Sequence, residues 1–303
     1  MTTSSGALSK AQVLGLYKIF NSTNPKLNTY WDKVMNVSTS KRGYEEAMQS
    51  TALTYAPVKP EGVQASSEDI KQSFVTRTQH KTFAKVFKVT REAYDDNLYK
   101  SEMGIAGLAD MKMMRDAFLR TKDRYVANMF NNGESSSVTY GDGQPMFSAS
   151  HPSEVGAVQS NLSSYTTFSE AATNQAFIRV MRTKSLEGTE LPLGITKVMV
   201  APEQRFEAER VFYSQLRPGT GNNDTNVFYE KADIIVNPYL TYSNGFTFFT
   251  DYRDDALTLF ERQNRDMREL PMEDDDVYRF YCSERYSSTL FDFRKVYGTV
   301  GVG

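Results

Sequence analysis

Residues Gly141–Pro152 read GDGQPMFSASHP, and this stretch decides between a protein that does chemistry and one that builds a structure. A polar turn leads into the pair Met146 and Phe147, and a Ser-x-Ser-His-Pro run follows. Ser148 and His151 are the residue types of a serine nucleophile and its base, so one hypothesis is a hydrolase. Side chains this close in sequence do not easily reach triad geometry, and the run lacks a Gly-x-Ser-x-Gly elbow. The favoured interpretation is a structural loop whose side chains satisfy local backbone amides.

The segment before this loop predicts the clearest helix of the chain, over residues 101–131. Apolar side chains recur there at three- and four-residue steps, with charged side chains between them. About thirty residues at 1.5 Å each give a rod of roughly 45 Å, which is long for a globular domain. Asn132 and Gly133 are expected to end the helix in a left-handed conformation. The apolar positions are Leu108, Met111, Met114, Phe118, Tyr125, Val126 and Met129, and the charged positions include Lys122 and Asp123.

The residues upstream of this helix predict a short helix, an arm and a hairpin. Residues 8–21 have a helical apolar pattern, and the polar stretch 24–42 predicts an extended arm with little to pack against in its own chain. Trp31 could anchor that arm on a neighbouring subunit, with ordinary packing as the equal alternative. Residues 44–91 carry prolines followed by β-branched, aromatic and lysine-rich runs, which predict a half-exposed hairpin with strands over 74–76 and 83–90. A projecting hairpin buries little of itself, so we expect a neighbour to cover it.

The residues after the loop mix helices and strands without a βαβ period. Pro202 suits the first position of a helix. This mixed order predicts an α+β fold. Helices are expected over 168–184 and 203–215, strands near 195–201, 232–237, 246–250 and 256–261, and an aromatic, β-rich end over 278–297.

The bulk composition excludes several classes of function. The 303 residues include 35 basic and 37 acidic side chains, so the chain lacks the basic excess of a protein that grips nucleic acid. Cys282 is the only cysteine, which excludes an internal disulfide, and two histidines leave little material for a metal site. No apolar run approaches the ~20 residues of a membrane helix, and the first residues lack a secretory pattern. We therefore expect a cytosolic protein with no membrane partner and no catalytic, cofactor-binding or metal-binding residues.

Three polar runs carry weaker hypotheses. Glu273–Asp276 could hold a divalent cation, but it lacks the alternating ligands of an EF-hand. A solvated turn, or a partner for basic residues of a neighbouring subunit, is favoured for it. Pro218–Asn223 lacks the Lys-Ser/Thr of a phosphate loop and predicts a mobile tip. Asp95 and Asp96 favour a helix start, where carboxylates meet the positive end of the helix dipole.

Three short motifs, in this order, resemble a known family. They are Phe83–Tyr99 (FAKVFKVTREAYDDNLY), Gly143–Pro152 (GQPMFSASHP) and Val236–Leu240 (VNPYL). Together they are similar to the major head subunits of Mu-like tailed phages, which have the Hong Kong 97-type capsid fold. The resemblance covers nearly the whole chain in its order of elements. It implies five regions: an N-terminal helix and arm (1–43), an extended hairpin loop (44–91), a peripheral domain with the spine helix (92–190), an axial domain (191–255) and return strands to the peripheral domain (256–303).

The resemblance also implies a function and partners. The protein would be a major capsid protein, not an enzyme, that self-assembles into pentamers and hexamers of an icosahedral head. The head would enclose double-stranded DNA with weak contact, and the protein would occur in the virion and, during assembly, in the host cytoplasm. A portal and a decoration protein are candidate partners, and a separate scaffolding protein is expected because no long charged helical segment follows Met1. The alternatives are a shell protein of a cellular nanocompartment with this fold and the hydrolase built on Ser148 and His151.

Overall fold

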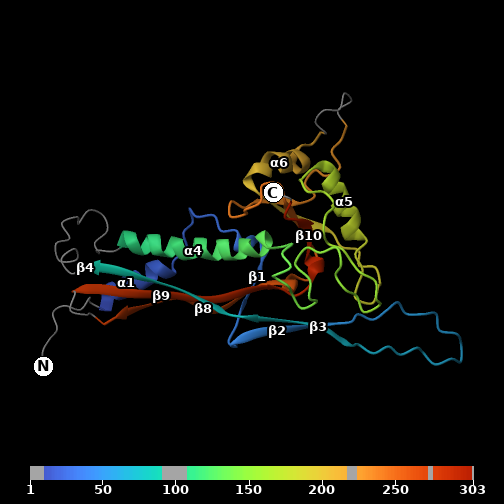
Figure 1. Cartoon of the computed structure of the whole chain (residues 1–303), viewed down its shortest axis with the longest axis horizontal. Helices are drawn as coiled ribbons and strands as arrows, with labels where there is room; N and C mark the ends of the chain where they lie inside the picture. The colour runs from blue at the N-terminus through green and yellow to red at the C-terminus, as the bar shows by residue number, and fades with distance from the viewer. Residues whose placement is uncertain (1–9, 91–107, 217–223, 272–275, 302–303) are drawn as a thin grey trace.

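The computed structural model describes residues 10–90, 108–216, 224–271 and 276–301. The molecule is elongated: a long sheet with a helix lying along it leads to a compact lobe, and a hairpin projects from the lobe's end of the molecule (Figure 1). Helices and strands follow one another in mixed order, which confirms the α+β expectation. Among the described residues, no helix is both long and apolar enough to cross a bilayer.

The long part of the molecule is a four-stranded sheet with α4 packed along it (Figure 1). The strand order is β1, β8, β9, β4, and of these neighbours only β1 and β8 run parallel. β8 and β9 have 14 residues each, which gives roughly 46 Å of strand. Val126 and Phe130 of α4 pack with Leu259 and Tyr286 of the strands. The bounds are β1 Asn36–Thr39, β4 Lys81–Thr90, β8 Leu257–Leu270, β9 Val277–Leu290 and α4 Leu108–Asn131.

Helix α4 ends differently from the expectation. Its predicted first part, residues 101–107, lies outside the described residues. Neither Asn132 nor Gly133 has a positive φ, so the predicted left-handed stop is wrong. A Cβ added to Gly133 would lie 2.6 Å from Cδ2 of Phe147 and 2.9 Å from the carbonyl oxygen of Phe130. The glycine is therefore needed for close packing between the helix end and the following loop.

The lobe is built on a second sheet, with the strand order β10, β7, β5, β6. β7 reads FTFFT and is buried along its whole length. Its Phe246 and Phe248 pack with Phe168, and Ser169 then caps α5 by accepting a hydrogen bond from that helix's backbone. The last strand, β10, thus belongs to the lobe and not to the long sheet that holds β8 and β9. The bounds are α5 Glu170–Met181, β5 Ile195–Val200, α6 Arg205–Tyr213, β6 Asp233–Val236, β7 Phe246–Thr250 and β10 Val296–Thr299.

The projecting hairpin consists of β2 (Tyr44–Ser50) and β3 (Gln72–Gln79), joined by residues 51–71. The prediction placed residues 83–90 in this hairpin, and that placement is wrong. These residues belong to β4, which pairs with β9 along its whole length in the long sheet. Composition could not distinguish the two, because β-branched and aromatic side chains suit a strand with either partner.

The N-terminal arm packs on its own chain, so the prediction that it lacks partners there is wrong. α1 (Lys10–Asn21) packs against α4, and β1 joins the long sheet beside β8. Val34 and Met35, just before β1, are buried. Trp31, which opens the short helix α2 (Trp31–Val34), packs against the same core, with Nζ of Lys122 4.9 Å from its ring. For Trp31 the ordinary-packing alternative holds.

Candidate assembly surface

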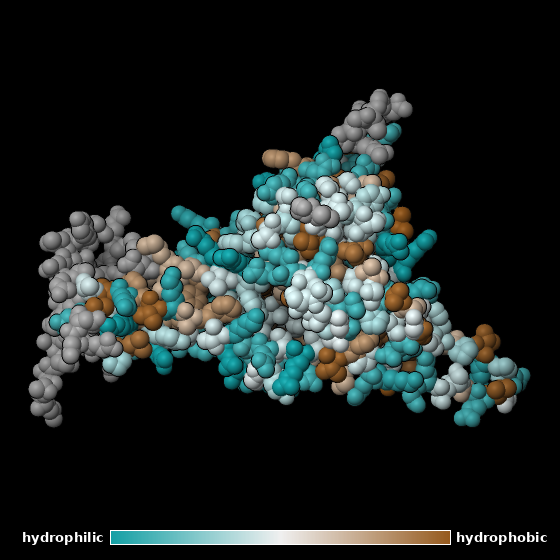
Figure 2. All heavy atoms as spheres, viewed as in Figure 1, coloured by the Kyte–Doolittle hydropathy of each residue, from teal (hydrophilic) through white to brown (hydrophobic). Residues whose placement is uncertain are grey.

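The loop at residues 51–71 exposes apolar side chains. It contains no helix or strand, although structureless loops of this length are uncommon in compact domains and are usually functional. Val58 is 94% exposed, and Figure 2 shows apolar atoms at the projecting end of the molecule. A second surface has to cover these side chains before they contribute to stability. The exposed apolar residues of the loop are Leu53, Tyr55, Val58, Val63 and Ile70.

Two side-chain hydrogen bonds hold the root of the hairpin against the rest of the subunit. Tyr55 Oη donates to Glu190 Oε2 at 2.8 Å, and Ser73 Oγ donates to Glu154 Oε1 at 2.5 Å. The bond from Tyr55 lowers the pKa of the Glu190 carboxyl. Tyr55 precedes the loop tip and Ser73 follows it. The two contacts therefore hold both ends of the loop against the subunit, and the tip between them projects.

The lobe exposes large apolar side chains on both of its helices. On α6, Phe206 is 78% exposed and Tyr213 is 52% exposed. Met181 at the end of α5 is 61% exposed, and Val227 is 70% exposed. Aromatic residues and methionine are enriched in protein interfaces. The hairpin and the lobe therefore both carry surfaces suited to contact with another protein.

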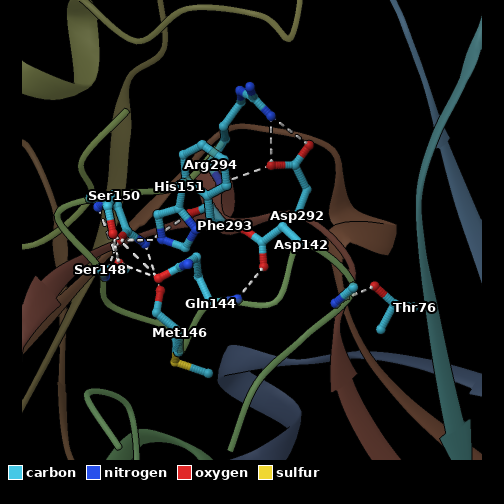
Figure 3. Close-up of polar contacts among 12 residues, drawn as sticks. Thr76, Asp142, Gln144, Met146, Ser148, Ser150, His151, Asp292, Phe293 and Arg294 are labelled. Atoms are coloured by element: carbon cyan, nitrogen blue, oxygen red, sulfur yellow. Dashed lines mark hydrogen bonds and ion pairs between the residues drawn. The ribbon is translucent and has the colours of Figure 1, made fainter. Parts of the chain in front are cut away.

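The loop with Ser148 and His151 does not have the geometry of a hydrolase (Figure 3). His151 is 1% exposed, with Nδ1 2.6 Å from Oδ2 of Asp142 and Nε2 3.0 Å from Oδ1 of Asn161. Both ring nitrogens are therefore engaged, and neither is free to take a proton from Ser148. The Ser148 hydroxyl instead donates to Oε1 of Gln144. A nucleophile needs a base within hydrogen-bond reach, and here the base is committed elsewhere.

The local bonds of this loop are structural. Ser148 Oγ accepts a hydrogen bond from the backbone N–H of Ser150, as the structural interpretation predicted. The prediction is wrong for His151, which contacts the side chains named above instead of backbone amides and stacks on Phe293 at 3.9 Å between ring centroids. The organising residue is Asn161, which the sequence interpretation missed. Its Nδ2 donates to the carbonyl of Met146, and its Oδ1 accepts from the N–H of Ser148. An isolated polar residue ten positions from His151 carries no sequence signal for this role.

Replacing Asn161 with alanine is expected to destabilise the subunit far more than Ser148→Ala. Asn161 is 4% exposed, and without its side chain several buried backbone groups lose their hydrogen-bond partner. Each such group costs about 1–3 kcal/mol of stability. We expect Asn161→Ala to lower the free energy of unfolding by at least about 3 kcal/mol and Ser148→Ala to lower it by less than about 1 kcal/mol. Urea unfolding of the two variants measures both values. Equal losses would contradict the assignment of Asn161 as the organiser.

The other candidate residues add no chemical site among the residues that the structure describes. Cys282 is buried, and burial raises the pKa of its thiol to about 12, as expected for a small apolar role. Within the described ranges, no group of three or more His, Cys, Asp or Glu side chains could hold a metal ion. Asp95 and Asp96, residues 218–223, and residues 273–275 of the acidic run lie outside the described residues.

Comparisons with known proteins agree with a structural role. The sequence profile of the family described as Phage capsid protein matches residues 74–298. No curated protein sequence matches the chain. The chain is similar in structure to the bacteriophage JBD30 capsid (13% identity, TM-score 0.50, covering 98% of this chain and 74% of that one).

Two further structures show the same fold. The Mycobacterium phage Che8 structure is 13% identical, with a TM-score of 0.54, and the match covers 92% of this chain and 94% of that one. The SrpI encapsulin of Synechococcus elongatus is 11% identical, with a TM-score of 0.53 and coverage of 96% and 95%. The predicted Hong Kong 97-type fold is confirmed. Because the family profile spans most of its length, this chain belongs to the phage capsid protein family.

Proposed function

We propose that this phage capsid protein is the major head subunit of a Mu-like tailed phage. Its copies form pentamers and hexamers of an icosahedral head that encloses double-stranded DNA. The observation that carries the proposal is the loop 51–71, whose apolar side chains project from the subunit and need another copy to cover them. Rings of identical subunits use heterologous contacts, in which two different patches meet. The exposed apolar side chains of the hairpin and the lobe supply two such patches.

We propose that the chain is divided into five structural regions. The arm is 1–43, the hairpin loop 44–91, the peripheral domain with its spine helix 92–190, the axial domain 191–255 and the return strands 256–303. The long sheet with α4 supports the peripheral region, and the lobe sheet supports the axial region. β4, from the second region, pairs with β9 in the long sheet, while α5, from the third, and β10, from the fifth, pack in the lobe. The boundaries therefore apply to the chain order more closely than to the packing.

The partners follow from the same proposal. The net charge of −2 suits a wall that encloses DNA with weak, non-specific contact. A separate scaffolding protein and a portal complete the head, which places the subunit in the host cytoplasm during assembly and in the virion afterwards. A decoration protein is a further partner, since the capsid of bacteriophage JBD30 is decorated with minor capsid protein trimers.

Electron microscopy of the purified protein tests the proposal. We expect capsomers or closed icosahedral shells, either from the protein alone or after co-expression with a scaffolding protein. A strictly monomeric protein under both conditions would contradict it. The nanocompartment alternative has the encapsulin fold in its favour, and the contents of the particles separate the two. Shells that package protein cargo and exclude DNA would favour the nanocompartment.

A further inference from the structure

The hairpin is joined to the long sheet through two short connections. Residues 40–43 link β1 to β2, and His80 alone links β3 to β4. The direction in which the hairpin projects therefore depends on the conformation at these two places, together with the bonds from Tyr55 to Glu190 and from Ser73 to Glu154. His80 is 7% exposed and Ser40, at the other connection, is 6% exposed. Ser40 and His80 are thus buried, although residues 41–43 are exposed and the strands that follow are largely exposed.

The imidazole of His80 ties both connections to the long sheet. Its Nε2 lies 3.1 Å from Oγ of Ser40, and its Nδ1 lies 3.0 Å from Oγ of Ser287 on β9. Ser287 is fully buried. The Ser40 hydroxyl also donates to Oε1 of Glu45, the second residue of β2. One ring therefore joins the entry to the hairpin, the exit from it and the sheet beneath.

The hydrogen bonds that connect Glu45, Ser40, His80 and Ser287 indicate which nitrogen of the His80 imidazole carries a hydrogen. A serine hydroxyl has one hydrogen, and that of Ser40 goes to the Glu45 carboxylate. Ser40 Oγ must then accept from His80, which places a hydrogen on Nε2. A neutral imidazole with its hydrogen on Nε2 has a bare Nδ1, which accepts from the Ser287 hydroxyl. With a neutral ring, every donor in this arrangement has an acceptor.

We propose that His80 is the positioning residue of the hairpin: its neutral imidazole locks both connections to β9, and a second proton releases the hairpin. This rests on the proposed function only in that the hairpin is taken to contact a neighbouring copy. A proton on Nδ1 forces the buried Ser287 hydroxyl to stop donating and leaves its hydrogen without that acceptor. A buried donor left unsatisfied is costly, so the locked arrangement weakens.

Burial opposes a second proton on His80, whereas the charges around the ring act in both directions. Arg285 of β9 and Arg262 of β8 oppose a positive ring, whereas Glu45 of β2 favours it. Burial is the largest effect, and the pKa of His80 is lowered. A base whose pKa is lower in the locked state takes up its proton more readily in the released state. The lock is therefore at full strength above the ordinary pKa of about 6.5 and weakens as the pH falls from there to the lower pKa of the locked ring.

The distance between the hairpin tip and α4 measures the lock in unassembled subunits. Val58→Cys and Thr121→Cys supply two exposed labelling sites, and the only native cysteine, Cys282, is buried. Spin labels on these sites should give one narrow distance distribution at about pH 7.5 and a broadened, shifted one at about pH 5. The released fraction should rise by up to about tenfold for each pH unit below about 6.5 until the locked ring itself titrates.

Three variants make the test specific to His80. His80→Gln keeps a neutral donor and acceptor and should hold the narrow distribution at both pH values. His80→Ala should give the broad distribution already at about pH 7.5. His151→Gln changes the only other histidine and should leave the pH response of the hairpin in place. The proposal is overturned if His80→Gln broadens with pH as the native protein does, or if His80→Ala stays narrow at the higher pH.

The result of the spin-label distance measurement does not depend on whether the proposed function is correct. The measurement uses single subunits, so a protein that never forms shells could still show the His80 lock. Conversely, shells with a pH-insensitive hairpin would support the capsid function and refute the lock.

Discussion

Replacing Val58 and Val63 with aspartate should abolish shell assembly while leaving the subunit folded. Val58 is 94% exposed and Val63 is 53% exposed, so neither contributes much to the monomer. Burying one valine under a neighbour stabilises the contact by about 1.5–3 kcal/mol, and an aspartate there also has to be desolvated. A loss of at least about 4 kcal/mol per contact corresponds to roughly a thousandfold weaker association. Negative-stain microscopy and analytical ultracentrifugation measure the loss of particles.

A charge control separates the lost apolar contact from repulsion alone. Gln64→Asp adds a negative charge beside Val63 on the same exposed loop without removing an apolar side chain. We expect this variant to assemble with at most a modest loss. Urea unfolding of the Val58→Asp, Val63→Asp double variant should match the native subunit within about 0.5 kcal/mol. Normal shells from the double variant would show that the loop tip is not an assembly contact.

The sequence predicted the parts of the fold whose pattern is local. The apolar stripe of α4, the cap at Ser169 and the proline before α6 each signal an element through neighbouring residues, and these elements are present. The pairing of β4 with β9 was missed, because strand composition does not name a partner nearly two hundred residues away. The organising role of Asn161 was missed for the same reason, since its bonds reach Met146 and Val296 from a loop.

The burial of the arm was also beyond the sequence pattern. A helix with one apolar stripe predicts one buried face, with charged residues such as Lys122 and Asp123 on the exposed side. In the structure the arm covers that side as well. Oδ1 of Asp123 accepts from the backbone N–H groups of Tyr30 and Trp31, which pins the arm across α4. A polar residue between the apolar positions of α4, Asp123, therefore holds the arm. Its burial could not be predicted, because the arm that covers it has no apolar periodicity of its own.

Lys122→Met should be the most destabilising single substitution in this part of the subunit. Lys122 is 5% exposed, and its Nζ contacts Glu284 and lies 2.8 Å from Oε1 of Glu261. Glu284 is 3% exposed, so removal of the lysine leaves its buried carboxylate without that ion-pair partner. Breaking a buried ion pair in this way costs about 3–5 kcal/mol. The exposed Lys33→Met is the matched control and should change the free energy of unfolding by no more than about 0.5 kcal/mol.

The pH dependence and a double variant identify the stranded carboxylate as the cause. Burial raises the pKa of Glu284 and Lys122 opposes that rise, so the pKa should climb further in Lys122→Met. An acid whose pKa is raised by folding binds its proton more tightly in the folded state. The variant should therefore lose most stability at neutral pH and regain part of it as the pH falls toward the raised pKa. Lys122→Met combined with Glu284→Gln removes the stranded charge, and we expect it to be more stable at neutral pH than Lys122→Met alone. If the double variant unfolds as easily as the single one, the loss comes from the lysine's contacts with the Trp31 and Tyr286 rings and not from the ion pair.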